Sequence, residues 1–379
     1  MEHITRILQE KIEERLIPGK AVLIYGARRV GKTILLQEIF KKERGKKVVL
    51  NGEDIEVQNM LRNRSVNNFR HLFEGIELLA IDEAQNIPEI GLAIKLIVDE
   101  IEGIKVLATG SSSFDLLNKI GEPLVGRASQ FILTPFSIKE ISERESGVEL
   151  RQNLENRLIY GSYPEVVGMS SNNMKEEYLR EIVNSYLLKD ILAIDGLRNS
   201  VKMNRLLQLI SYQVGSEVKL DELGKQLGMH RETVEKYLDL LSKVFIIYKV
   251  GAFSRNMRKE VSKAGKWYFY DNGIRNAIIG NFKDASNRHD MGELWENYFI
   301  TEKLKENQNQ LLHQQLYFWR TYDQQEIDLI IEKNDGIAAY EMKWGKKNPK
   351  APAGFVKAYE QVEYNVVNPE NYLNFFINP

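Results

Sequence analysis

The sequence predicts a protein of the α/β class with two or three domains, the first of them built on a parallel β-sheet. Strand-length apolar runs alternate with helically spaced apolar residues between residues 20 and 110. Residues 151–211 have a helical pattern, and strand-like runs return in the C-terminal third. A chain of 379 residues is too long for one ordinary domain, and with 43% hydrophobic residues it can bury a sizeable core.

Composition excludes several classes of protein. Lysine and arginine total 52 against 53 for aspartate and glutamate, so a uniformly basic nucleic-acid coat protein is excluded, although local basic patches are not. The absence of cysteine excludes disulfide scaffolds, thiolate zinc sites, iron–sulfur clusters and cysteine nucleophiles. The N-terminal stretch lacks the apolar core of a secretory signal, and no run is long enough to cross a membrane. We therefore expect a cytoplasmic protein with no membrane partner.

A glycine-containing loop between a strand and a helix is the first candidate site. An apolar run begins at Lys20, residues 26–33 read GARRVGKT, and helical spacing continues to Phe40. This loop fits G-x-x-x-x-G-K-[ST], in which backbone N–H groups curl around phosphates at a helix N-terminus. Lys32 is expected to reach the β- and γ-phosphates, and the Thr33 hydroxyl to bind Mg²⁺. The predicted nucleotide-binding residues of this segment are Gly26, Ala27, Arg28, Arg29, Val30, Gly31, Lys32, Thr33 and Ile34. The alternative is a glycine-rich turn with an incidental lysine.

Two acids end the next buried strand. Residues 76–83 read IELLAIDE, and ligands collect at the carboxyl ends of strands in a parallel sheet. Asp82 is therefore predicted to bind the Mg²⁺ that bridges the phosphates, and Glu83 to polarise the attacking water. The alternative for Asp82 is that it caps the following helix.

Two further features complete the predicted site. The strand IKVLATG runs into Ser111, Ser112 and Ser113, and Ser111 is expected near the γ-phosphate. Arg127 is a cation that could stabilise transition-state charge, either within its own chain or across a subunit interface. A plain surface arginine is the alternative.

These motifs resemble those of the AAA-type P-loop ATPases found in many bacterial and archaeal proteins. The matching segments are GARRVGKT, IDEAQNIPE, ATGSSS, and LVGR followed by TPFSIKE, and the resemblance covers roughly residues 1–145. It implies that the nucleotide is ATP and that Lys32, Thr33, Asp82 and Glu83 bind and hydrolyse MgATP. We accordingly expect an ATPase domain over residues 1–150. Because such ATPases often form rings, a homo-oligomer is one expectation.

The middle region, residues 151–265, has the outline of a helix-turn-helix with a wing. A short helix is followed by a turn at Gly228, a second helix from about Arg231, and a strand. The residues expected at the base-facing end of the second helix are His230, Arg231, Glu232, Thr233 and Lys236. Between Lys243 and Lys266 the basic residues are Lys243, Lys249, Arg255, Arg258, Lys259, Lys263 and Lys266, against the acid Glu260. This surplus favours DNA as a partner, and the alternative is a packing module between domains.

The C-terminal region, residues 266–379, contains a second candidate site. A helix, GELWENYFITEKL, precedes two strands that contain EIDLII and YEMKW. If these strands are adjacent, Asp328, Glu341 and Lys343 converge. Two carboxylates can hold Mg²⁺ or Mn²⁺, and a lysine beside them can stabilise charge on a phosphodiester. Asp328 and Glu341 are therefore predicted as both metal ligands and catalytic residues, together with Lys343.

This arrangement resembles the PD-(D/E)xK core of restriction-type endonucleases, with Glu293 and Glu296 on the preceding helix. The resemblance implies a C-terminal α/β restriction-endonuclease-like domain. Ile327 stands where the motif often has proline. Two alternatives are a descendant of that fold without catalytic activity and simple ion pairing across the strands.

The combination of this ATPase with YFYDNG, EIDLII and EMKW resembles one widespread family over almost the whole chain. Two functions follow as expectations. In one, ATP gates DNA binding and metal-dependent cleavage by the C-terminal region. In the other, ATP switches a module that binds a protein partner, and the nuclease-like residues are silent.

Overall fold

A computed structural model describes residues 4–111, 124–187, 200–253, 265–321, 323–333, 336–359 and 361–377. The chain forms two compact units. The smaller unit comprises Thr5–Thr134 with Lys243–Phe245, and the larger comprises Met1–Ile4, Pro135–Ser242 and Ile246–Pro379. The smaller unit thus ends before the expected domain boundary at residue 150.

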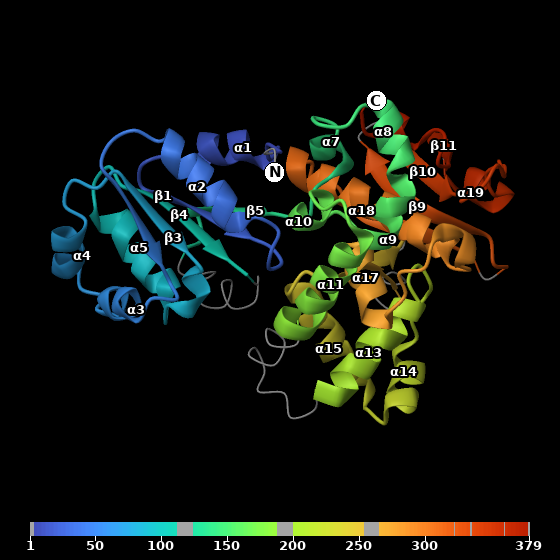
Figure 1. The fold of residues 1–379 in the computed structure, drawn as a ribbon, viewed down its shortest axis with the longest axis horizontal. Coiled ribbons are helices and arrows are strands. Elements are labelled where there is room, and N and C mark those ends of the chain that lie inside the picture. The colour runs from blue at the N-terminus through green and yellow to red at the C-terminus, as the bar shows by residue number, and fades with distance from the viewer. Residues whose placement is uncertain are drawn as a thin grey trace. The chain divides into compact units, whose positions relative to one another are not determined.

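The smaller unit is a parallel α/β sheet of five strands in the order β2-β3-β4-β1-β5 (Figure 1). Its strands are β1 (Lys20–Tyr25), β2 (Lys47–Asn51), β3 (Leu78–Asp82), β4 (Lys105–Gly110) and β5 (Ala128–Ile132). Its helices are α1 (Leu8–Arg15), α2 (Lys32–Lys42), α3 (Ile55–Arg62), α4 (Val66–Leu72), the short 3-10 helix η1 (Ala84–Asn86) and α5 (Ile90–Glu100). Helices α1 and α2 pack against one another and on the sheet. Helix α5 also packs on the sheet, and it contacts α3 and α4.

Continuous apolar character explains why the central strands are covered on both faces. Residues 21–24 of β1 and 78–81 of β3 have no exposed surface. Strands buried on both faces read as unbroken apolar runs rather than as alternating ones. The predicted parallel α/β sheet is confirmed, and the carboxyl ends of β1, β3 and β4 lie at one edge of it.

The first half of the larger unit is helical. Its helices are α7 (Ile138–Ile141), α8 (Gly147–Gln152), α9 (Leu154–Tyr160), α10 (Pro164–Val167), α11 (Asn172–Glu181), the π-helix η3 (Ile182–Leu187), α13 (Ser200–Tyr212), α14 (Leu220–Leu227) and α15 (Arg231–Lys243). Helices α14 and α15 flank Gly228, whose φ of 58° is the left-handed conformation that ends α14. The predicted order of helix, glycine turn and helix is confirmed.

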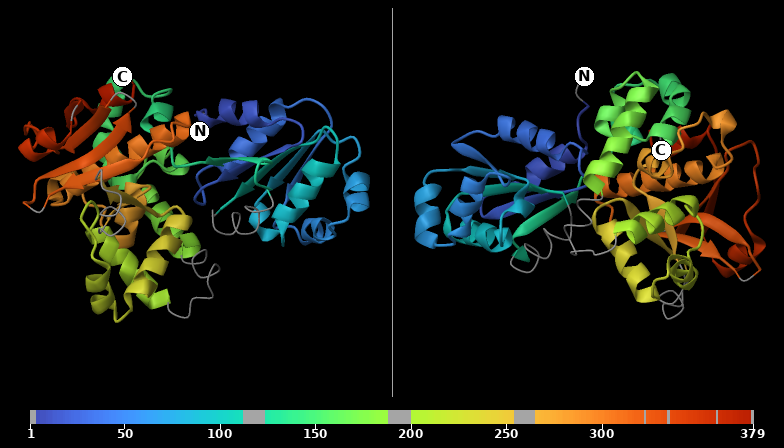
Figure 2. Two further views of the ribbon diagram at one scale, coloured as in Figure 1. Left: turned by 180° about the vertical axis from the view of Figure 1, so that it is seen from behind. Right: turned by 60° about the horizontal axis from the view of Figure 1, so that its bottom comes forward.

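The second half of the larger unit is built on a mixed sheet of six strands in the order β11-β10-β9-β8-β6-β7. The strands are β6 (Ile247–Ala252), β7 (Lys266–Phe269), β8 (Leu316–Arg320), β9 (Glu326–Lys333), β10 (Gly336–Met342) and β11 (Val362–Val367). The remaining helices are α17 (Asn272–Ile279), η4 (Ala285–Asn287), α18 (Met291–Gln310), α19 (Ala353–Ala358) and η5 (Tyr372–Phe375), with α18 in orange beside the sheet in Figure 2.

The strand expected to begin a wing belongs to this sheet. β6 and β7 pair antiparallel, as the strands of a wing would, but β6 also pairs with β8 in parallel. The hairpin is thereby one edge of the C-terminal sheet, and the expected boundary between residues 265 and 266 falls inside it.

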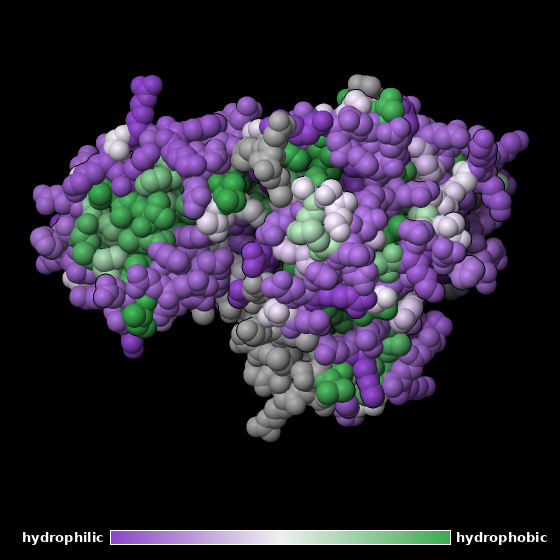
Figure 3. Space-filling view, in the orientation of Figure 1, coloured by the Kyte–Doolittle hydropathy of each residue, from purple (hydrophilic) through white to green (hydrophobic). Residues whose placement is uncertain are grey.

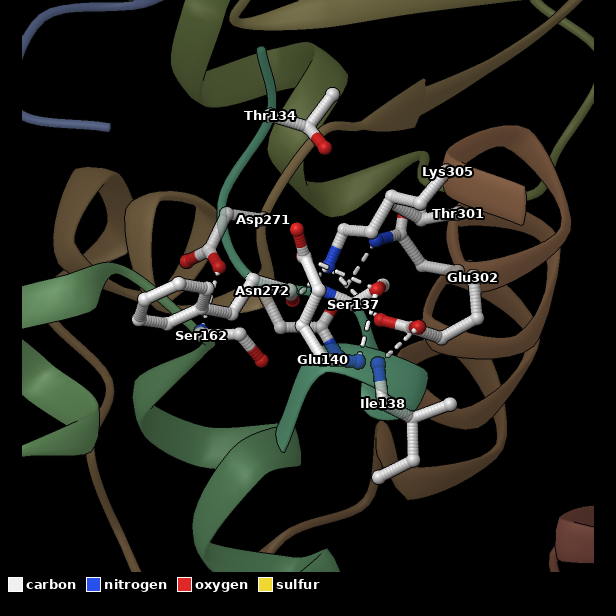
Figure 4. A network of polar contacts seen from close by, with 12 residues as sticks. Thr134, Ser137, Ile138, Glu140, Ser162, Asp271, Asn272, Thr301, Glu302 and Lys305 are labelled. Carbon is white, nitrogen blue, oxygen red and sulfur yellow. Dashed lines mark hydrogen bonds and ion pairs between the residues drawn. The ribbon is translucent and has the colours of Figure 1, made fainter. Parts of the chain in front are cut away.

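A buried polar network fastens the segment after Pro135 to α18 (Figure 4). Glu302 accepts a hydrogen bond of 2.7 Å from the backbone N–H of Ile138, and Lys305 donates one of 2.9 Å to the carbonyl of Phe136. Glu302 and Lys305 also form an ion pair of 2.8 Å although their side chains are only 1% and 3% exposed. Their charges compensate one another inside the protein, where an isolated charge would be costly.

The surface is mainly hydrophilic on the face in Figure 3, with an apolar area on the smaller unit. Exposed apolar side chains of that unit include Ile17, Ile34, Val49, Ile55 and Leu92. Within the ranges described above, no helix combines the length and the apolar character needed to span a membrane.

Candidate functional site

The loop of residues 26–31 connects the end of β1 to the start of α2. A Cβ on Gly26 would lie 2.1 Å from the carbonyl oxygen of Leu133, so only glycine fits there. Gly31 precedes α2 with φ 96°, a conformation that side chains disfavour. Both glycines of the motif are thus required by the backbone, which brings the loop to a helix N-terminus where anions bind.

Lys32 is folded back onto the loop. Its ammonium donates hydrogen bonds of 3.0 and 2.9 Å to the carbonyl oxygens of Gly26 and Ala27, and the residue is 5% exposed. Val30 has no exposed surface, whereas Ile34 is 51% exposed. The Val30 side chain therefore anchors the loop in the protein interior, and only the backbone of Val30 can contact a phosphate.

The side chains predicted to bind magnesium are already in contact. Thr33 Oγ1 donates a hydrogen bond of 2.8 Å to Asp82 Oδ2, and the Thr109 hydroxyl donates to Asp82 Oδ1. Thr109 is fully buried at the end of β4. A hydroxyl and a carboxylate at adjacent strand and helix ends are the oxygen ligands that Mg²⁺ favours.

Glu83 directly follows β3 and has a left-handed backbone with φ 49°. Its N–H donates to Thr109 Oγ1 at 3.2 Å, and its Oε2 accepts a hydrogen bond of 2.5 Å from the Gln85 amide. Gln85 in turn accepts one of 3.3 Å from the backbone N–H of Ser111. A Cβ on Gly52, just after β2, would lie 2.3 Å from the Glu83 carbonyl oxygen. The ends of β2, β3 and β4 therefore fix the position of Glu83.

The structure brings most of the predicted nucleotide site together, with one exception. Lys32, Thr33, Asp82, Glu83 and Ser111 lie at the carboxyl ends of β1, β3 and β4 or in the turns that follow them. Ser112 and Ser113 lie outside the described residues. The loop arginines also belong to this site: Arg28 is half-buried, and Arg29 has a left-handed backbone with φ 65°.

Arg127 lies at the opposite edge of the sheet. It precedes β5, whose first residue pairs with Ala21 at the start of β1, whereas the phosphate loop follows the end of β1. Arg127 Nε donates a hydrogen bond of 2.6 Å to Asp99, which raises the pKa of the arginine. This placement excludes contact with a phosphate in its own nucleotide site, and a role across a subunit interface stays a prediction.

Sequence reasoning missed three residues of this site. Thr109 and Gln85 contact the two predicted acids, and Arg6 donates a hydrogen bond of 3.2 Å to the carbonyl of Val30 in the loop. Thr109 lies in the segment ATG and Gln85 in the segment DEAQ, next to the motif residues. Their position in the sequence could therefore have indicated that they belong to the site. Arg6 is distant in sequence, and nothing in the local pattern indicates its contact.

In the larger unit, the second candidate site contains one lysine more than predicted. Lys266 is 2% exposed, and its ammonium lies 3.3 Å from Glu296 and 2.5 Å from Glu326. Tyr268 also donates a hydrogen bond of 2.7 Å to Glu296. Lys266 therefore enters the cluster as a buried counter-ion, which corrects the expectation that it is a surface cation for DNA phosphates.

The predicted residues Asp328, Glu341 and Lys343 belong to the same cluster as Lys266. Asp328 Oδ2 accepts a hydrogen bond of 2.8 Å from the backbone N–H of Met342, and Lys343 forms an ion pair of 2.5 Å with Glu341. Burial raises the pKa of Glu296 to about 7 and raises those of Asp328 and Glu341, while Lys266 opposes the shift for Glu296 and Asp328. Among the described residues, no group of three or more histidine, aspartate or glutamate side chains is arranged to hold a metal ion.

The outer surface of α15 carries the predicted base-facing residues. His230, Arg231, Glu232 and Lys236 lie at the start of this helix with Thr233, which is half-buried. Arg231 forms an ion pair of 3.6 Å with Asp221. Of the basic residues predicted nearby, Lys249 is exposed, but Arg255, Arg258, Lys259 and Lys263 lie outside the described residues.

Three family models match separate parts of the chain. Residues 18–142 match a model described as an AAA domain. Residues 151–285 and 291–374 match two models described as domains of unknown function, DUF8612 and DUF4143. The first match supports an AAA-type P-loop ATPase domain, in agreement with the parallel sheet and the loop geometry.

The chain is also similar to several known proteins. An uncharacterized protein of Methanocaldococcus jannaschii is 25% identical over 94% of this chain and 81% of its own length, and one of Mycobacterium tuberculosis is 23% identical over 88% and 72%. A RuvB mutant of Thermotoga maritima aligns at 17% identity and a TM-score of 0.33 over 64% of this chain and 88% of its own. A STAND protein with a tetratricopeptide repeat sensor from Pyrococcus horikoshii aligns at 15% identity and a TM-score of 0.29 over 79% and 44%. The likeness to the AAA domain is therefore the finding that bears on function.

Proposed function

We propose that this protein binds and hydrolyses MgATP at the loop of residues 26–33. The observation that carries the proposal is the contact between Thr33 and Asp82, 2.8 Å apart at the phosphate end of the sheet. Lys32 would release its carbonyl partners to hold the β- and γ-phosphates, and Thr33 and Asp82 would hold Mg²⁺. Glu83 would accept a proton from the attacking water. The likeness to the AAA domain supports ATP as the nucleotide.

Binding of a fluorescent ATP analogue tests this proposal. Lys32→Ala is expected to abolish binding, because the ammonium that neutralises the phosphates is lost. Thr33→Val removes a metal ligand but keeps the shape of the side chain, so it should weaken binding only when Mg²⁺ is present. Equal affinities for the wild-type protein and Lys32→Ala would contradict the proposal.

For the C-terminal cluster we propose a silent role rather than metal-dependent cleavage. Lys266 supports this choice, since its ammonium is paired with Glu296 and Glu326. A catalytic metal ion bound in this cluster would have to compete with that ammonium for the carboxylates. A buried lysine between carboxylates supplies the positive charge that a divalent ion would otherwise supply. The cluster would then join β7, β9 and α18 by ion pairs without holding Mg²⁺ or Mn²⁺.

Cleavage of labelled single- and double-stranded DNA tests the silent role directly. With Mg²⁺ or Mn²⁺, and with or without ATP, the wild-type protein is expected to leave both substrates intact. Cleavage that is lost in Asp328→Asn and in Lys343→Met would instead establish the nuclease function, with Asp328, Glu341 and Lys343 as its active site.

We also propose that the protein binds another macromolecule. The exposed apolar side chains on the smaller unit support association with another protein chain, including a second copy. The polar and charged residues at the start of α15 support DNA as the alternative partner. Binding to DNA through phosphates should weaken by orders of magnitude when salt is raised several-fold, whereas association through apolar surfaces should not. Light scattering with and without ATP reports a homo-oligomer.

A further inference from the structure

The side chain of Gln85 bridges two functional parts of the nucleotide site. Its Nε2 donates a hydrogen bond of 2.5 Å to Glu83 Oε2, and its Oε1 accepts one of 3.3 Å from the backbone N–H of Ser111. Gln85 is only 8% exposed, and it lies in the short helix η1 immediately after the acid. One buried amide therefore connects the predicted catalytic carboxylate to the end of β4.

The chemistry of an amide fixes the direction of this bridge. A carboxylate accepts hydrogen bonds only, and a backbone N–H donates only. If the amide were turned over, its oxygen would face Glu83 and its NH₂ group would face the Ser111 N–H, so both contacts would become repulsive. Each end of Gln85 therefore matches one partner, and neither a carboxylate nor an apolar side chain at position 85 reproduces both contacts.

We propose that Gln85 is a positioning residue for ATP hydrolysis, which holds one oxygen of Glu83 and leaves the other to accept the proton from water. The inference rests on the proposed function, because it concerns the same reaction. A glutamate side chain has three rotatable bonds, and restricting it to one rotamer costs conformational free energy. Gln85 restricts the Glu83 side chain through its hydrogen bond, as outer residues orient the ligands of other catalytic sites.

The same bridge links Glu83 to the γ-phosphate end of the site. Ser111 follows the strand that also carries Thr109, and Thr109 contacts both Asp82 and the backbone of Glu83. A shift of Ser111 on phosphate binding would move the Gln85 amide and, with it, the Glu83 carboxylate. Gln85 thus makes the orientation of the Glu83 carboxylate depend on the position of Ser111 at the end of β4.

Gln85→Met tests the proposal because methionine keeps the length of the side chain and loses the amide. We expect kcat for ATP to fall about tenfold, as for other residues that orient a catalytic group, while KM and the affinity for ATP change less than about twofold. Asn86→Ala is the matched control, since Asn86 is the exposed neighbour of Gln85, and it should keep the wild-type kcat. Unchanged kcat in Gln85→Met would overturn the proposal.

A double variant separates this inference from the proposed function. If Gln85 acts through Glu83, then Gln85→Met should cause no further loss of turnover in a Glu83→Gln background. A wild-type protein that does not hydrolyse ATP would refute the proposed function, and with it the role of Gln85. A Glu83→Gln variant without turnover, combined with wild-type turnover in Gln85→Met, would refute the role of Gln85 alone.

Discussion

Replacing Lys305 by methionine should strongly destabilise the larger unit. The Lys305 and Glu302 side chains are 3% and 1% exposed, so Glu302 would remain as a buried charge without its counter-ion. Removal of one partner from such a pair costs about 3–5 kcal/mol. Methionine retains most of the volume of the lysine chain, so a cavity contributes little to this loss.

Lys303→Met is the matched control on the same helix. Lys303 also pairs with an acid three residues away, but its partner Glu306 is 21% exposed and can be solvated. Lys303 is itself only 9% exposed and also donates a hydrogen bond to the carbonyl of Phe375, so its loss should cost stability, but less than the loss of Lys305. Adding Glu302→Gln to Lys305→Met removes the orphaned charge and keeps an acceptor for the Ile138 N–H, so the double variant should regain part of the lost stability.

Urea unfolding followed by tryptophan fluorescence measures these differences in one unit. The tryptophans Trp267, Trp295, Trp319 and Trp344 all belong to the larger unit, so the signal does not report on the smaller one. A loss for Lys305→Met no greater than that for Lys303→Met would refute the reasoning from burial.

Three other predictions concern separate parts of the protein. Burial raises the pKa of Asp271 to about 6 from 3.8 in the unfolded chain, so the folded state binds the proton more tightly, and stability should fall as the pH rises from about 4 to 6. Asp271→Asn should remove this fall, on the order of 3 kcal/mol, and a difference between the two proteins that does not vary with pH would argue against it. Arg127→Ala should leave ATP turnover unchanged in the dilute monomer, and a large loss there would contradict its placement at the far edge of the sheet. Gly26→Ala should abolish ATP binding while tryptophan fluorescence still reports a folded larger unit, because the added Cβ would collide with the Leu133 carbonyl; wild-type affinity would show that the loop can move aside.

The convergence of the candidate nucleotide-site residues could be predicted from the sequence because its signals are local. Each of Lys32, Thr33, Asp82 and Glu83 lies next to a strand or helix end, and the ends of parallel strands meet at one edge. The same rule places Arg127 at the opposite edge, since it precedes its strand rather than following it. Gln85 was overlooked although it lies two residues from Glu83, because a glutamine in a polar turn is usually solvated.

The interior of the larger unit was less predictable because its contacts join distant segments. Lys266 looked like part of a basic surface, and its burial depends on the pairing of β6 with both β7 and β8. Glu302 and Lys305 have the spacing of an ordinary solvated pair on a helix, and only the packing of the segment after Pro135 buries them. Charge patterns along the chain do not reveal which charges the fold will cover.

Turnover of ATP by Glu83→Gln, measured beside its affinity for ATP, tests whether Glu83 is the general base of ATP hydrolysis. Glutamine preserves the shape of the side chain and cannot accept the proton from water. We expect this variant to bind MgATP as tightly as the wild-type protein does and to hydrolyse it at least about a hundredfold more slowly, the low end of the effect of a general base. Wild-type turnover in Glu83→Gln would contradict the assignment of Glu83 and the mechanism built on it.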